Sequence, residues 1–463
     1  MKFRIQLVAQ HTDGGENISE IATLEREDLT NSSLGLSLTE AKTLLLQLQH
    51  EIVRHQVDEF INDVRLCSCG KDHRFKGHHH ISYRTLFGKI KVSSPRFYTC
   101  CDPDVEHNSF SPLARKITDR TSPELLYLES KWASLMSYGM TSELLNDVLP
   151  ISSNSTTVYN HTQKIAQRLE DEVEQEEHFY VAGCERDWAE LPMPEMPLIV
   201  GIDGGYIRER QDNKRKAGNC EVIVGKSIPY NGKGKCFAYV SGDDRPKRRL
   251  HNLLKSQGMQ NNQNITFLSD GGENVRNLQF HLSPQAEHLL DWFHITMRIT
   301  VIRQMMKGLQ PHPDMWFTPD KMHTQMERVK WFLWHGNCYQ ALQILYILRE
   351  PLEIFFDQKN KYAKTWKKVH ELIIYIENNR SFIPNYGERH RHGERISTGF
   401  IESAVNQVIS KRFAKKQQMR WTRQGAHYLL QIRVKVINED LQSAFRDWYP
   451  DFEIHSEEMA DVA

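Results

Sequence analysis

Three acidic residues stand where a carboxylate could bind a metal ion. Asp203 closes the apolar run PLIVGID, Asp270 closes the apolar run ITFLSD, and a pair of glycines follows each of them. Glu402 lies in STGFIESAVNQVISKRF, whose apolar residues recur at helical spacing. Mg²⁺ binds oxygen ligands, typically one or two carboxylates completed by waters and phosphate oxygens. Two such ions about 4 Å apart can activate a nucleophile and stabilise the leaving oxygen of a phosphoryl transfer.

Each aspartate also has a simpler explanation, because Asp-Gly is a common turn signal. The repeated pattern of apolar run, Asp and two glycines favours a shared site over two unrelated turns. An acid at the C-terminal end of a buried strand lies at the edge of the sheet, where α/β proteins bind ligands. Glycines lack a Cβ and let a substrate or another backbone come close. We therefore expect Asp203 and Asp270 at the ends of two strands.

The elements that must position these acids follow from the hydrophobic pattern. In chain order it predicts strands at 197–203, 220–228 and 236–242, a helix at 246–257, a strand at 265–270, a helix at 273–282, an apolar stretch at 287–293 that runs into a helix to about 308, a mainly helical region at 310–393, and a helix at 399–413. Three strands in series followed by helix, strand, helix and strand indicate a mixed α/β sheet.

The N-terminal half has a different character. Apolar residues at helical spacing predict an amphipathic helix over 38–65, and alternating residues up to Cys101 predict a β-ribbon.

Two helices at 141–149 and 155–175 suit a helix-turn-helix. The second would present Asn160, Lys164 and Arg168 to phosphates and base edges. An ordinary helical hairpin is the alternative.

The sequence resembles the DDE-type transposases of bacterial insertion sequences, and most closely their ISKra family. The residues that carry the resemblance are VGIDGGYIRER, FLSDGGENVRNL, LLDWFHITMRI and ERISTGFIESAVNQVISKRF, and it extends from about Cys67 to Leu441. It implies an RNase H-like catalytic domain interrupted by a helical insertion. It also implies that Asp203, Asp270 and Glu402 bind two Mg²⁺ (or Mn²⁺) ions.

The element DWFH, residues 291–294, is similar to an acid-x-x-His element of transposases with a helical insertion. The resemblance implies that His294 contacts the scissile phosphate or orders the active site. A histidine satisfied at a strand–helix junction is the alternative. Asp291 is the catalytic carboxylate that would replace Asp203 or Asp270 should either prove structural.

Two close pairs of cysteines, Cys67/Cys69 and Cys100/Cys101, suit a zinc ribbon. Zinc takes four tetrahedral thiolate or imidazole ligands, usually from two such pairs. The relatives in the resembling family carry Cys-x-x-Cys at both ends, whereas the spacings here are C-x-C and C-C. Either the ribbon lacks its metal, or His73 or a histidine of 78–80 completes the set.

A basic stretch follows the helix that carries Glu402. Its candidate DNA-binding residues are Lys411, Arg412, Lys415, Lys416, Arg420 and Arg423, with Trp421 among them. A solvated basic face is the alternative. The chain as a whole carries 59 basic and 59 acidic residues, which argues against a strongly basic DNA-packaging protein. Local basic patches still suit phosphate binding.

No apolar run approaches the roughly 20 residues of a membrane-spanning helix, and the N-terminus lacks the apolar core of a secretory signal. We therefore expect a cytoplasmic protein, nucleoid-associated when bound to DNA. The resemblance implies binding to the terminal inverted repeats of its element and to target DNA, as a homodimer or higher oligomer.

The sequence thus predicts a multidomain α+β transposase that cleaves DNA and transfers the strand. The expected parts are an N-terminal region with an amphipathic helix (1–66), a β-ribbon (67–111), a helical DNA-binding region (112–190), a catalytic domain (197–309 with 394–440), a helical insertion (310–393) and a C-terminal tail (441–463). The alternatives are a nuclease of the same fold and a catalytically silent DNA-binding protein derived from a transposase.

Overall fold

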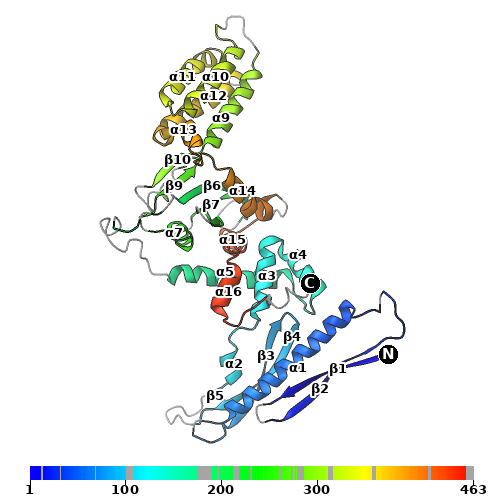
Figure 1. Ribbon diagram of the computed structural model, residues 1–463. Coiled ribbons are helices and arrows are strands. Elements are labelled where there is room, and N and C mark those ends of the chain that lie inside the picture. The colour runs from blue at the N-terminus through cyan, green and yellow to red at the C-terminus, as the bar shows by residue number, and fades with distance from the viewer. Residues whose placement is uncertain are drawn as a thin grey trace. The chain divides into compact units, whose positions relative to one another are not determined.

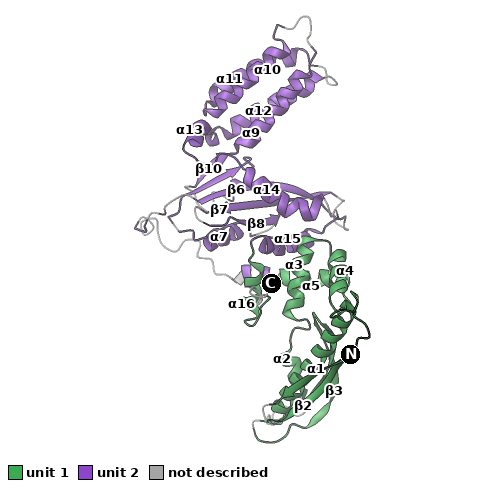
Figure 2. Ribbon diagram, turned by 45° about the vertical axis from the view of Figure 1, so that its right-hand side comes forward, with its two compact units in different colours: residues 1–168, 439–463 green, residues 169–438 purple. Residues whose placement is uncertain are grey.

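Two units divide the chain, residues 1–168 with 439–463 and residues 169–438 (Figures 1 and 2). The division falls within one helix, α5. The structure is a computed structural model. It describes residues 1–454 except 12–13, 32, 68, 101–108, 176–189, 193, 195–197, 212–217, 230–231, 243–244, 261, 273–274, 277, 279–285, 311–315, 357–360 and 416–418.

The first unit begins with two antiparallel strands, β1 (Lys2–Gln10) and β2 (Glu16–Glu25). Helix α1 (Leu38–Arg65) follows, and Ser37 and Glu40 form a capping box at its start. The predicted β-ribbon is confirmed as an antiparallel sheet. Its strands are β3 (Phe75–Thr85), β4 (Gly88–Tyr98) and β5 (Ser109–Phe110), and short helix α2 (Pro112–Lys116) comes next. Val57 of α1 packs on Ile81 and Ile90 of this sheet.

Four helices complete the first unit: α3 (Pro123–Leu135), α4 (Tyr138–Val148), the part of α5 (Ser155–Gln175) up to residue 168, and α16 (Leu441–Trp448). Phe445 of α16 is fully buried, and its ring meets that of Tyr127 at 5.3 Å. Phe452 joins the same cluster. The expectation of a tail from 441 onward is therefore wrong for 441–454, because its apolar residues fill a core.

The second unit contains a five-stranded mixed sheet in the order β10-β9-β6-β7-β8. Its strands are β6 (Leu198–Arg208), β7 (Asn219–Ile228), β8 (Lys235–Val240), β9 (Ile265–Ser269) and β10 (Glu287–Leu290). The first three run antiparallel in series, and β9 and β10 extend the sheet in parallel with β6. This confirms the predicted mixed sheet.

Helices cover both faces of this sheet (Figure 1). Leu250 and Leu254 of α7 (Pro246–Ser256) pack in one core with Val200 and Ile202. The opposite face receives α14 (Gly399–Val405) and the π-helical segment η2 (Asn406–Ala414). Helix α15 (Arg423–Ile437) lies along the edge strand β8, where Gln431 donates to the Ala238 carbonyl. Because successive strand residues point to opposite faces, Asp203 lies on the α14 side.

A helical bundle occupies the chain between β10 and α14. Its helices are α9 (Trp292–Lys307), α10 (Pro319–Trp334), α11 (Cys338–Ile354), α12 (Lys361–Asn379), η1 (Arg380–Phe382) and α13 (Tyr386–Arg391). They share a core of their own that includes Ile299, Met326, Leu345 and Ile376. The prediction of helices across 310–393 holds for the residues described. No helix found among them is long and apolar enough to span a membrane.

We predict that Phe445→Ala destabilises the protein by about 3–5 kcal/mol, because it leaves a cavity beside Tyr127. Arg446→Ala on the exposed side of the same helix should change stability by no more than about 0.5 kcal/mol. Urea unfolding followed by tryptophan fluorescence measures both. Equal stabilities for the two variants would contradict a structural role for α16.

Candidate active site

Asp203 lies in the middle of β6, opposite Val224 of β7. The expectation that it ends its strand is wrong, because the strand continues through the glycines to Arg208. Gly201 and Gly205 share its face of the sheet. A Cβ at Gly201 would come within 2.6 Å of the Phe400 ring, and one at Gly205 within 2.8 Å of Ile409. The two glycines therefore let the α14–η2 helix approach Asp203 closely.

Asp270 follows the end of β9, as predicted. Its side chain accepts a hydrogen bond from the Gly272 backbone N–H at 3.0 Å. Its backbone carbonyl accepts a hydrogen bond from the Tyr375 hydroxyl of α12 at 3.0 Å. Burial raises the pKa of Tyr375, so this group stays a neutral donor. The helical bundle thus holds the loop that carries Asp270.

Glu402 lies exposed in the first turn of α14, and its backbone N–H donates to the Thr398 carbonyl at 3.1 Å. Partial removal from water raises the pKa of its carboxyl group. The charge of His294 opposes this shift, and those of Asp291 and Asp203 add to it. Glu402 is therefore electrostatically coupled to residues from three other points in the sequence.

The same neighbours act on Asp203, which is half-buried. Burial raises the pKa of Asp203, the Gly204 N–H and His294 oppose the shift, and the charges of Asp270 and Asp291 add to it. The charges of Asp203 and Glu402 thus act on each other and are both influenced by His294 and Asp291, and the charge of Asp270 acts on Asp203. Within the described ranges, their oxygens do not form a set whose members all lie within 4.8 Å of one another. Like charges repel, so cations are needed to draw such a set together.

Asp291 caps α9 and is fully buried. Its carboxylate accepts hydrogen bonds from the Phe293 N–H at 2.9 Å, the Thr398 N–H at 3.0 Å and the Thr398 hydroxyl. Its own N–H donates to the Ser269 carbonyl at 2.9 Å. These contacts make Asp291 a positioning residue that ties the Asp270 loop and the start of α9 to the residue before α14.

His294 lies one turn into α9, with its Nε2 atom 3.6 Å from the nearer carboxylate oxygen of Asp291. That nitrogen has no hydrogen-bond partner in the part of the chain that the structure describes. The alternative, a histidine whose hydrogen bonds are satisfied at the strand–helix junction, therefore does not fit. This nitrogen is buried beside the Asp291 carboxylate.

The basic stretch after α14 divides into exposed and buried residues. Lys411, Lys415 and Arg420 are exposed, and Lys416 lies outside the described residues. Arg412 is fully buried, with its guanidinium 5.2 Å from the centre of the Trp421 ring. The predictions that Arg412 and Trp421 bind DNA are therefore wrong, because both side chains pack in the interior.

Arg423, predicted to bind DNA, pairs instead with the buried Glu209. Two of the three residues of α5 predicted to bind DNA also have partners on the same chain. Lys164 forms an ion pair with Asp119, and the Arg168 guanidinium stacks 4.3 Å from the Trp448 ring centre. Asn160 is exposed. Several of the basic residues predicted to bind DNA therefore interact with partners on the same chain instead.

The cysteine cluster is brought together by the ends of α1 and β4. The sulfurs of Cys67, Cys69 and Cys100 lie within 4.8 Å of one another, and those of Cys69 and Cys100 are 3.6 Å apart. Three thiolates at this spacing could hold a metal ion. Cys101 lies outside the described residues. The alternative ligand His73 packs edge-on against Phe110 and is not part of the cluster.

Sequence patterns did not single out Thr398 or Tyr375, although both hold the carboxylate site in place. Their partners are remote in the chain, so no local pattern marks them. A scan against models of known protein families and a search of curated proteins give no match to this chain. The evidence for function is therefore the site itself.

Proposed function

We propose that this chain is a DDE transposase that cleaves DNA and transfers the strand, with Asp203, Asp270 and Glu402 as ligands of two Mg²⁺ ions. The observation that carries the proposal is the convergence of these acids. They come from the middle of β6, the end of β9 and the first turn of α14, and the charge of Asp203 interacts with those of both Asp270 and Glu402. A binding protein has no use for carboxylates that repel both one another and DNA.

The sheet supports the proposal. Three antiparallel strands extended by two parallel strands are the arrangement that we expect of an RNase H-like domain. The helical bundle between β10 and α14 fits the insertion that the resemblance implies. Asp270 and Glu402 are then far apart in sequence because the insertion separates them.

The chemistry is phosphoryl transfer without a covalent protein–DNA intermediate. Water attacks the phosphodiester at an element end, one P–O bond forms and one breaks, and a 3′-hydroxyl leaves. That hydroxyl then attacks a phosphodiester of target DNA in the same way. Bound divalent ions would neutralise the phosphate and activate the attacking oxygen. Asp203 would supply ligand oxygens from the sheet and Glu402 from the helix. The His294 Nε2 atom, which is buried and has no hydrogen-bond partner among the described residues, would donate to the phosphate.

The partners follow from this reaction. Joining two element ends to one target requires that both ends be held, so we propose a dimer or higher oligomer on DNA. The exposed Lys411, Lys415 and Arg420 beyond Glu402 suit contacts to the DNA backbone. A nuclease of the same fold would cut without joining, and product analysis separates the two.

We also propose that the cluster of Cys67, Cys69 and Cys100 binds a structural Zn²⁺ ion. We predict about one zinc per chain by mass spectrometry of the metal content, and its loss in Cys69→Ser. Cys338→Ser, far along the chain in α11, is the matched control and should keep the metal. A zinc-free native protein would refute this assignment, as would zinc retained by Cys69→Ser.

The raised pKa values of Asp203 and Glu402 predict a pH dependence. A carboxyl group whose folded pKa exceeds its unfolded pKa stabilises the fold when protonated, and this stabilisation is lost as the pH rises through the folded pKa. The metal-free protein should therefore lose stability as the pH rises above roughly 4, the ordinary pKa of a carboxyl group, and passes through the raised pKa values of Asp203 and Glu402. Mg²⁺ binds the ionised groups and should restore stability toward pH 7. Melting temperatures with and without Mg²⁺ test this, and Asp203→Asn should weaken both effects.

The decisive measurement is a cleavage and strand-transfer assay on DNA that carries the segments flanking the gene. We expect Mg²⁺-dependent joined products that EDTA abolishes. Asp270→Asn and Glu402→Gln should each lower the rate by at least about a thousandfold, since metal ligation supplies several kcal/mol. Asp320→Asn removes an acid from the exposed start of α10 and should leave the rate unchanged. Tight DNA binding without products would favour the non-catalytic alternative.

A further inference from the structure

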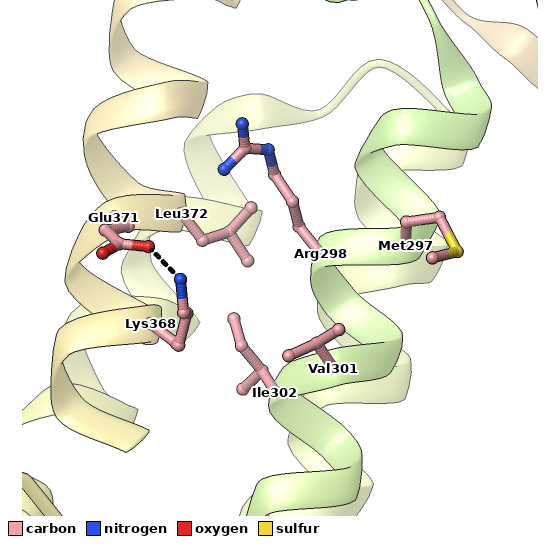
Figure 3. A pocket seen from close by; sticks show the side chains of 7 residues that line it. All are labelled: Met297, Arg298, Val301, Ile302, Lys368, Glu371 and Leu372. Carbon is pink, nitrogen blue, oxygen red and sulfur yellow. Dashed lines mark hydrogen bonds and ion pairs between the residues drawn. The ribbon is translucent and has the colours of Figure 1, made fainter. Parts of the chain in front are cut away.

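A cavity of about 170 Å³ lies between α9 and α12, in the part of the bundle that adjoins the carboxylates. Its lining residues are Met297, Arg298, Val301, Ile302, Lys368, Glu371 and Leu372. Figure 3 shows the Arg298 side chain extending from α9 into the space between the two helices. Lys368 and Glu371 face this space from α12 and pair with each other at 2.7 Å.

Arg298 is linked to the carboxylate site by two contacts. Its guanidinium lies 4.2 Å from the centre of the Tyr375 ring, and the Tyr375 hydroxyl donates to the Asp270 carbonyl. Arg298 also follows His294 by one helical turn, so both side chains share one face of α9. A cation is thus held beside the acids by an aromatic ring.

The charge of Arg298 has no acidic counterpart. The side chain is exposed, and none of the carboxylates in the described ranges lies within ion-pair distance of it. The guanidinium also hydrogen-bonds with the Tyr375 side chain, and its other N–H donors remain for an acceptor with paired oxygens. On α12, Lys364 and Lys367 are exposed close to Lys368. Of the charged residues that line the cavity itself, Arg298 and Lys368 are basic and Glu371 is acidic, so the seam between α9 and α12 carries one more positive than negative charge.

We propose that Arg298 and this seam bind a backbone phosphate of the DNA strand next to the phosphate that is cleaved. The inference rests on the proposed function and names a residue that positions the substrate. The neighbouring carboxylates repel DNA, so a strand that enters the site needs a fixed cation on its path. A phosphate offers the paired oxygens that a guanidinium binds best. Because Tyr375 contacts both Arg298 and Asp270, it fixes the position of the bound DNA strand relative to Asp270.

The test is the salt dependence of binding to a 30-base-pair duplex of mixed sequence, measured by fluorescence anisotropy without divalent ions. Each phosphate contact contributes about −0.9 to the slope of log affinity against log salt concentration. We expect Arg298→Gln to reduce the magnitude of the slope by about 1, and Arg298→Lys to retain it. Arg328→Gln removes the same charge from α10, outside this seam, and should leave the slope unchanged.

A slope for Arg298→Gln equal to that of the native protein and of Arg328→Gln overturns the inference. Tyr375→Phe keeps the ring under Arg298 but removes the hydroxyl that donates to Asp270. It should keep the native slope and lower the cleavage rate at saturating DNA about tenfold, as loss of a supporting hydrogen bond does in metal sites. Native protein that binds DNA without cleaving it refutes the proposed function alone, because the slopes still decide the role of Arg298. Native protein that binds no DNA refutes both.

Discussion

The carboxylate site of the second unit depends on the hydrogen bonds of the buried Asp291 side chain. An ionised group without partners would be very costly in the interior, and here three donors surround it. Two of the donors belong to Thr398, so the chain leaves the sheet for the helical bundle and returns to it at the same point. The Thr398 carbonyl in turn accepts a hydrogen bond from the Glu402 backbone N–H. The position of Glu402 therefore follows from that of Asp291.

The site also depends on how closely a helix can approach a strand. The missing side chains of Gly201 and Gly205 bring α14 and η2 onto the face of the sheet that carries Asp203. Removing acids from water opposes folding, and crowding their like charges adds to the cost. The raised pKa values of Asp203 and Glu402 reflect burial first and the neighbouring acids second. The surrounding hydrogen bonds and the core of the bundle hold the acids in place despite their repulsion.

Hydrophobic periodicity was enough to predict most helices and strands, because it reports which face of each element is buried. The features that it did not predict depend on contacts between residues that are distant in the sequence. Glycines extended β6 past Asp203, although their local signal is for a turn. Arg412 and Trp421 were placed on a basic surface, but they pack against each other inside. The role of Thr398 depends on a partner more than a hundred residues away, which no local pattern records.

The nesting of the chain has a consequence for its synthesis. Residues 169–438 are inserted within the first unit, whose core needs Phe445, and the bundle is inserted within the sheet unit before Glu402. A ribosome therefore releases Glu402 late, and the core aromatics Phe445 and Phe452 of the first unit later still. A chain whose synthesis stops before residue 402 lacks both this carboxylate and the aromatic side chains that complete the core of the first unit.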